Sequence, residues 1–239
     1  GGLGFIVVTD IWYYISNRSN SISFTTKMIT LSFFGVLLIA TTITFFGETT
    51  IQQFPAFERL EVALFQTVNA ISTAGYNSIP LSNLTLGVLL TIIFLMYVGA
   101  APSSTGGGMK ITTLTAVIAI VKSKVRNQAK VTYLGKKIPA DRLEMAVSTF
   151  IFYTAILFFS VFLLSFTENH SLEKLLFEAT SAIGTVGLSM GITGSLSVWG
   201  KIILISIMFI GRVGVITFGL AILAKKQHKK IDNETDLAV

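Results

Sequence analysis

One segment occurs twice in this chain, and the duplication limits the fold more than any other feature. Residues 60–77, LEVALFQTVNAISTAGYN, return as residues 172–189, LEKLLFEATSAIGTVGLS. The copies align without a gap at the offset of 112 residues that separates Gly75 from Gly187, and each carries a Thr-x-Gly triplet near its end. Because self-similarity at a fixed period marks duplicated architecture, the sequence predicts two units of similar structure.

The composition is typical of a membrane protein. Hydrophobic residues make up 52% of the 239 residues, charged residues only 13%, and the mean hydropathy is +0.74, which is too apolar for an ordinary soluble domain. Cysteine is absent, so disulfides and thiolate metal sites are excluded. We do not expect an enzyme, because the sequence has no Ser-His-Asp set, intramembrane carboxylate pair or nucleotide fingerprint.

The positive charge lies in the connections between apolar segments. Lysine and arginine gather in residues 122–142 and in the tail after residue 224, whereas residues 48–61 and 168–174 carry mostly acids. Since basic loops face the cytoplasm, both basic segments are predicted to lie inside. The net charge of +6 thus indicates how the chain is oriented in the membrane and does not indicate nucleic-acid binding. Anionic lipid or a cytosolic subunit are further candidate partners of the basic segments.

The first unit is predicted to span, re-enter and span again. Residues 27–46 are apolar over about 20 residues, enough to cross ~30 Å of hydrocarbon. The helical part of the repeat, 60–71, rises only ~18 Å and is too short to span. Residues 84–121 would form a helix of roughly 57 Å, so we expect a break at 99–108, where proline and three consecutive glycines oppose helix formation.

The second unit repeats this order, with 145–166 spanning outward, 172–183 re-entering and 199–224 returning inward. An even number of crossings gives both units the same orientation, so we expect parallel repeats in an all-α membrane protein. The expected boundaries are 1–20 for the end of a preceding unit, 21–142 and 143–226 for the two complete units, and 227–239 for a cytoplasmic tail.

Short extended backbone is predicted after each re-entrant helix, at 72–76 and 184–188. Carbonyl oxygens there can replace the hydration shell of K+ as in potassium filters, and glycine allows the required dihedral angles. Two copies cannot surround an ion alone. The alternative is that each triplet only caps a helix before a turn. The residues expected to hold K+ through backbone carbonyls are Thr73, Ala74, Gly75, Tyr76, Thr185, Val186, Gly187 and Leu188.

The break at 99–108 is the candidate gate, since a small, polar, glycine-rich segment at membrane depth could cross the ion path below the filter. A static kink or close helix packing through small residues is the alternative. A phosphate-binding loop does not fit the spacing of residues 106–110. The candidate gate residues are Gly99, Pro102, Ser103, Ser104, Thr105, Gly106, Gly107 and Gly108.

Arg212 is the cation expected to face this gate. A cation at the bilayer centre costs about 2.5–3.5 kcal/mol on insertion scales, and the end of the segment at Lys225 is roughly 20 Å away, too far for snorkelling. Arg212 is therefore expected to bond to backbone carbonyls, with those of 99–108 as the best candidates. A structural pin without a gating role is the alternative, and Lys110 is expected to be interfacial or to serve packing.

Four motifs, TAGYN, GAAPSSTGGGMKITT, TVGLSMG and MFIGRVG, carry a family resemblance over nearly the whole chain. They resemble the third and fourth units of the Trk/Ktr/HKT superfamily of potassium transporters, most of all the membrane subunit of bacterial Ktr systems. The resemblance implies four potassium-channel-like units about a pseudo-fourfold axis, each with one filter glycine, here Gly75 and Gly187. It also implies that 99–108 is an intramembrane gate. Val215 departs from the proline expected after GRVG.

The resemblance further implies a multi-pass protein of the bacterial cell membrane that forms a homodimer with a cytosolic nucleotide-binding regulatory ring. K+ is the expected permeant ion, with Na+ as a candidate coupling or stimulating ion. Because the first filter and most of the second would lie outside this chain, we expect the chain to start inside a longer protein. An alternating-access transporter and a structural or signalling subunit without a permeant remain as alternatives.

Overall fold

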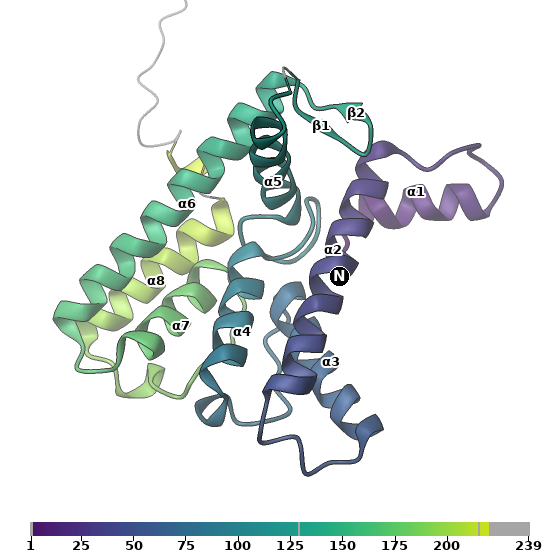
Figure 1. The fold of residues 1–239 in the computed structure, drawn as a ribbon. Helices are drawn as coiled ribbons and strands as arrows, with labels where there is room; N and C mark the ends of the chain where they lie inside the picture. Colours follow the sequence, from purple (N-terminus) through teal and green to yellow (C-terminus); the bar gives the residue numbers. More distant parts are fainter. Residues whose placement is uncertain (1, 129, 215, 220–239) are drawn as a thin grey trace, which may run out of the picture.

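The computed structural model describes residues 2–128, 130–214 and 216–219, and most of them are helical (Figure 1). The helices are α1 (Phe5–Ile15), α2 (Phe24–Gly47), α3 (Ala56–Ser72), α4 (Leu86–Val98), α5 (Ile111–Val125), α6 (Ala140–Thr167), α7 (Leu172–Ile183) and α8 (Val198–Val213). Short 3-10 turns at Leu81–Asn83 and Thr193–Ser195 precede α4 and α8, and β1 (Thr132–Tyr133) pairs with β2 (Lys136–Lys137).

The helices form two units in the same order. α2, α3 and α4 make the first unit, which continues into α5, and α6, α7 and α8 make the second (Figure 1). In both units the long first helix runs away from the β hairpin, and the last helix returns toward it. This order matches the one predicted from the duplicated segment. Among the described residues, α2 and α6 are the helices long and apolar enough to cross a membrane.

The start predicted for the first short helix was wrong. α3 begins at Ala56 instead of residue 60 and has 17 residues, or about 25 Å. Pro55 precedes it with φ −54°, which suits the start of a helix, and Glu58 lies in the first turn, where a carboxylate favours the helix dipole. The helix still rises only to the middle of the molecule before the chain returns toward the start of α4 (Figure 1).

The predicted break in 84–121 is confirmed. α4 ends at Val98, and Gly99 caps it with φ 67°, a left-handed conformation that favours glycine. α5 begins only at Ile111. The connecting residues 99–110, named the glycine-rich loop below, turn back on themselves, since a Cβ on Gly99 would lie 2.7 Å from Gly108 Cα.

The helix predicted over residues 199–224 is interrupted. α8 ends at Val213, because Gly214 adopts φ 94° and ψ 128°, which is not helical. Residues 216–219 are helical again, while Val215 and residues 220–224 lie outside the described part. Arg212 therefore stands in the last turn of a shorter helix and not in the middle of a long one.

The connection between the units contains a small β hairpin, which the all-helical prediction missed. Leu134 and Gly135 form its turn with φ of 48° and 75°, the two positive values that a type I′ hairpin turn requires. Tyr133 Oη lies 3.1 Å from Ser32 Oγ of α2, which also accepts a bond from Thr115 Oγ1 of α5 at 3.0 Å. The first bond holds the hairpin against α2, and the second joins α5 to the same serine.

The two units pack together through α4 and α7. Leu89, Ile92 and Met96 of α4 are buried in one cluster with Phe177 of α7 and with Val186 just beyond it. Burying such side chains contributes about 1.5–3 kcal/mol each. α4 of the first unit therefore packs against α7 of the second unit and against the turn that follows α7.

In each unit, a carboxylate at the end away from the hairpin links the first helix to the start of the last helix. Glu48 follows α2 and accepts a bond from the backbone N–H of Thr85 at 2.9 Å, directly before α4. Glu168 follows α6 and accepts from the backbone N–H of Ser197 at 3.1 Å, directly before α8. Hydrogen bonds from Ser197, chiefly from its hydroxyl, hold the pKa of Glu168 below its ordinary value of 4.5.

Because the pKa of Glu168 is lowered by folding, its bonds stabilise the fold above pH 4.5 and are lost as the pH falls through the folded-state pKa. We expect Glu168→Gln to melt at a lower temperature than wild type near neutral pH and to lose less on acidification toward about pH 3. Thermal unfolding at several pH values measures this. Glu173→Gln, which changes an exposed carboxylate, is the control, and parallel curves for wild type and Glu168→Gln would contradict the expectation.

Candidate functional site

α3 ends in a left-handed turn that carries the first candidate glycine. Thr73 caps the helix with φ 56°, and the backbone N–H of Ala74 donates to Asn69 O at 3.1 Å. Gly75 follows with φ 80°. Two positive φ values within three residues redirect the chain, and we name residues 72–76 the first glycine turn.

α7 ends in the same way, at residues 184–188, the second glycine turn. Thr185 has φ 50°, Val186 N–H donates to Ser181 O at 2.9 Å, and Gly187 has φ 95°. Each of these positions lies 112 residues after its counterpart in the first turn. A β-branched threonine rarely adopts positive φ, so the packing around both turns holds the backbone in this shape.

The two glycine turns lie side by side. A Cβ built on Gly187 would lie 3.9 Å from Gly75 Cα, and one on Gly75 would collide with the carbonyl oxygen of Val186. Segments separated by more than 100 residues thus bring their backbone carbonyls to one place. In the described part of the chain no group of three or more His, Cys, Asp or Glu could hold a metal ion. The backbone carbonyls of the two turns are neutral oxygen atoms.

The side chains of the two turns differ in burial. Val186 and Leu188 are buried against the α4 cluster, at 4% and 2% exposure. Tyr76, the counterpart of Leu188, is 70% exposed, and Ala74 is exposed as well. The side chains of Val186 and Leu188 in the second turn are therefore covered by this chain, whereas those of Ala74 and Tyr76 in the first turn are open.

The tip of the glycine-rich loop is held by the start of the described chain. Ala101 N–H donates to Gly2 O at 2.9 Å, and Phe5 N–H donates to Ser103 O at 3.3 Å. Pro102 lies between these two bonds in the sequence. The candidate residues Pro102 and Ser103 thus stand where the loop meets the start of the described chain.

The other end of the loop lies directly against both glycine turns. Gly107 N–H donates to Thr73 Oγ1 at 3.1 Å. A Cβ on Gly106 would lie 3.0 Å from Ser72 O, and one on Gly107 would collide with the carbonyl oxygen of Gly184. Only glycine allows the loop to come this close to the ends of α3 and α7.

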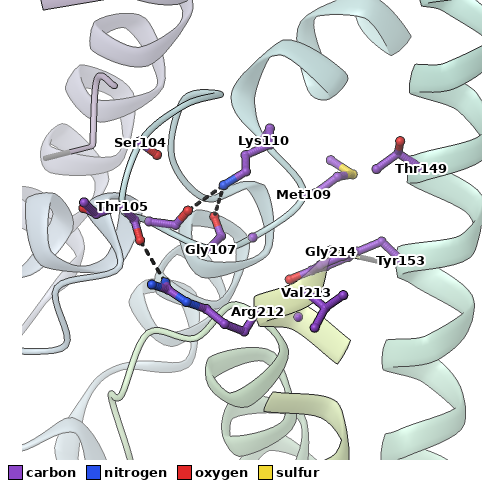
Figure 2. A pocket seen from close by; sticks show the side chains of 13 residues that line it. Ser104, Thr105, Gly107, Met109, Lys110, Thr149, Tyr153, Arg212, Val213 and Gly214 are labelled. Atoms are coloured by element: carbon purple, nitrogen blue, oxygen red, sulfur yellow. Dashed lines mark hydrogen bonds between the residues drawn. The ribbon is translucent and has the colours of Figure 1, made fainter. Parts of the chain in front are cut away.

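Two cationic side chains, those of Arg212 and Lys110, donate hydrogen bonds to carbonyl oxygens of the glycine-rich loop. Arg212 Nη1 donates to Thr105 O at 3.2 Å, and Lys110 Nζ donates to Gly106 O and, at 3.5 Å, to Gly107 O. Figure 2 shows both cationic groups pointing into the same loop. The bond predicted for Arg212 is present, with Thr105 as its partner.

Lys110, expected to be interfacial or to serve packing, bonds two carbonyls of its own loop. Sequence reasoning did not single out these bonds, because it weighed only Arg212 against the cost of a buried cation. The same cost applies to Lys110, which follows three glycines in the middle of an apolar stretch. Both side chains border a cavity of about 440 Å³ between the glycine-rich loop, α6 and the end of α8. Tyr153 of α6 lines it too.

Comparisons with known proteins show the family of this chain. The family model described as TrkH, cation transport protein, matches residues 9–233. The chain is 34% identical over 221 residues to Ktr system potassium uptake protein B of Vibrio alginolyticus, covering 91% of this chain and 48% of that protein. It is 35% identical over 233 residues to the potassium/sodium uptake protein NtpJ of Enterococcus hirae, covering 94% and 51%.

The fold agrees as well. The crystal structure of the potassium transporter TrkH from Vibrio parahaemolyticus superposes with a TM-score of 0.76 at 19% identity, over 94% of this chain and 49% of that one. The chain thus spans about half the length of the relatives that it matches. Since the family match covers nearly all of its residues, the chain belongs to the TrkH family of cation transport proteins.

Proposed function

We propose that this chain forms part of a membrane subunit for potassium uptake, in which K+ passes through a filter of backbone carbonyls. The adjacency of Gly75 and Gly187 carries the proposal. Carbonyl oxygens of residues 73–76 and 185–188 would supply half of the ligands that replace the hydration shell of the ion. Equivalent turns from the rest of the protein would supply the other half about a pseudo-fourfold axis.

The glycine-rich loop is the proposed gate below this filter. Support comes from its bond to Thr73 and its close approach to Gly184, which leave it against the ends of both pore helices. Arg212 and Lys110 hold the loop there and place two positive charges on the ion path. These positive charges repel K+. The loop held by Arg212 and Lys110 therefore corresponds to a closed gate.

The protein is proposed to be a multi-pass component of the bacterial cell membrane, in contact with lipid. α2 and α6 would span from the cytoplasm outward, since the basic 122–142 connection marks the inner end. A homodimer with a cytosolic nucleotide-binding ring is proposed from the resemblance to Ktr systems. Na+ is the proposed coupling or stimulating ion, since one relative is named a potassium/sodium uptake protein.

The proposal is tested by measuring Rb+ uptake. The complete protein is expressed for this in a bacterial strain that lacks its own potassium uptake. We expect uptake that depends on the membrane potential, worth about 2.3 kcal/mol per charge per 100 mV, and that K+ inhibits more strongly than Na+. A cycle that exchanges solute or requires a stoichiometric co-substrate would favour alternating access instead. Absence of uptake in a strain that inserts the protein correctly would contradict transport.

A further inference from the structure

Glu178 is a buried carboxylate directly behind the second glycine turn. It lies in α7 with 4% of its surface exposed. Its Oε1 accepts bonds from Ser189 Oγ at 2.6 Å and from Met190 N–H at 3.0 Å, and its Oε2 accepts from Thr193 Oγ1 at 2.9 Å. A carboxylate is costly to bury unless donors satisfy it, and here three donors do so.

All three donors belong to residues 189–193, the segment that leaves the second glycine turn. The turn is also held from inside, because Gly187 N–H donates to Ser181 Oγ at 3.2 Å. Bonds to a charged group are stronger than bonds between neutral groups. Glu178 therefore fixes the path of the backbone where it leaves Gly187.

The first glycine turn has a weaker form of the same anchor. Gln66 of α3 stands 112 residues before Glu178, and its Oε1 accepts a bond from Ser78 N–H at 3.3 Å. Ser78 is the counterpart of Met190 by the same offset. The recurrence of one side-chain acceptor and one backbone donor in both units indicates that the contact belongs to the turns and not to local packing.

The second turn has room to move if the anchor is lost. A cavity of about 490 Å³ lies beside it, bordered by Glu178, Thr185 and Gly187 and by Leu204 and Met208 of α8. Atoms that line a cavity have no packing contacts on that side, so packing does not hold the turn in place there. The hydrogen bonds to Glu178 are thus the restraint on this flank of the turn.

We infer that Glu178 is a positioning residue that sets the ion selectivity of the second glycine turn by anchoring residues 189–193. The inference rests on the proposed filter and adds to it a residue that does not touch the ion. Gln66 does the same for the first turn through a single bond. Loss of the Glu178 anchor lets the carbonyls of residues 185–188 relax, so that Na+ competes better with K+.

Two substitutions separate hydrogen bonding from charge. Glu178→Gln keeps the pattern, since its amide oxygen accepts from Ser189 and Met190 and its amide nitrogen donates to Thr193 Oγ1. Glu178→Leu removes every bond at similar volume. In Rb+ uptake by the complete protein we expect Glu178→Leu to lower the K+/Na+ inhibition ratio about tenfold or more, Gln66→Leu to lower it less, and Glu178→Gln to stay within about twofold.

Glu173→Leu, on the same helix but at the exposed end, is the matched control and keeps the wild-type ratio. If Glu178→Leu fails to fold in a thermal unfolding assay, the pair Ser189→Ala and Thr193→Val removes two donors and leaves the carboxylate, and the ratio should fall in the same direction. An unchanged ratio in either folded protein, or equal damage in Glu178→Gln and Glu178→Leu, would overturn the inference. Gly187→Ala without effect in this assay would instead overturn the filter itself.

Discussion

Gly75→Ala is expected to lower Rb+ uptake by about 100-fold. Alanine at φ 80° is strained, and its Cβ would collide with the carbonyl oxygen of Val186 in the neighbouring turn. Backbone strain of this kind costs about 1–3 kcal/mol, and the collision displaces carbonyls that the proposal assigns to the ion. Since about 1.4 kcal/mol corresponds to a tenfold change, ~3 kcal/mol accounts for the expected loss. Initial rates of Rb+ uptake at matched expression measure it.

Two further glycines make this prediction specific. Gly187→Ala should lower uptake less, because its φ of 95° causes strain but its Cβ would meet only Gly75 Cα, at 3.9 Å. Gly35→Ala in α2 is the control, since no neighbouring atom lies within 4 Å of its Cβ and alanine favours the helix. Equal uptake by the Gly75→Ala and Gly35→Ala proteins would contradict the role of the first glycine turn.

The order of the helices could be predicted from sequence because a local rule decides each part of it. The duplicated segment gave two units, and membrane thickness required that 84–121 be broken, as Gly99 and Ile111 mark in the structure. The bond of Arg212 followed from the cost of an unpaired cation in an apolar helix. In each case one dominant energy term decides the local structure, and a single stretch of sequence is enough to identify that term.

The parts that sequence reasoning missed depend on contacts between distant segments. Thr73 and Thr185 adopt positive φ where the glycine-rich loop lies against the ends of α3 and α7, and no threonine propensity indicates this. The hairpin is marginal alone and exists through Tyr133 and its bond to α2. The end of α8 at Gly214 reflects one glycine whose conformation the sequence leaves open.

The same contacts link the two candidate sites. Thr73 belongs to the first glycine turn, and its hydroxyl accepts the bond from Gly107 of the loop. The second turn touches the loop through Gly184 but has the additional anchor at Glu178. Movement of the loop would therefore disturb the first turn more than the second, which couples the proposed gate to the first glycine turn of the proposed filter.

Arg212→Met is expected to raise Rb+ uptake about tenfold. The substitution keeps an unbranched apolar stem, but it removes the bond to Thr105 O and one positive charge from the proposed ion path. A hydrogen bond from a charged group contributes about 1.5–3 kcal/mol, and losing ~1.4 kcal/mol shifts the balance between closed and open loop tenfold. Initial rates of Rb+ uptake in the strain without its own potassium uptake measure the change.

Lys110→Met should act in the same direction, because Lys110 bonds two carbonyls of the same loop. The matched control is Lys201→Met: Lys201 also donates to a backbone carbonyl, Gly194 O at 3.2 Å, but on the exposed connection before α8. Its uptake should equal that of wild type. If Arg212→Met and Lys110→Met also transport at the wild-type rate, both cations are structural pins, and the closed state must depend on the contacts of Gly106 and Gly107 with the glycine turns alone.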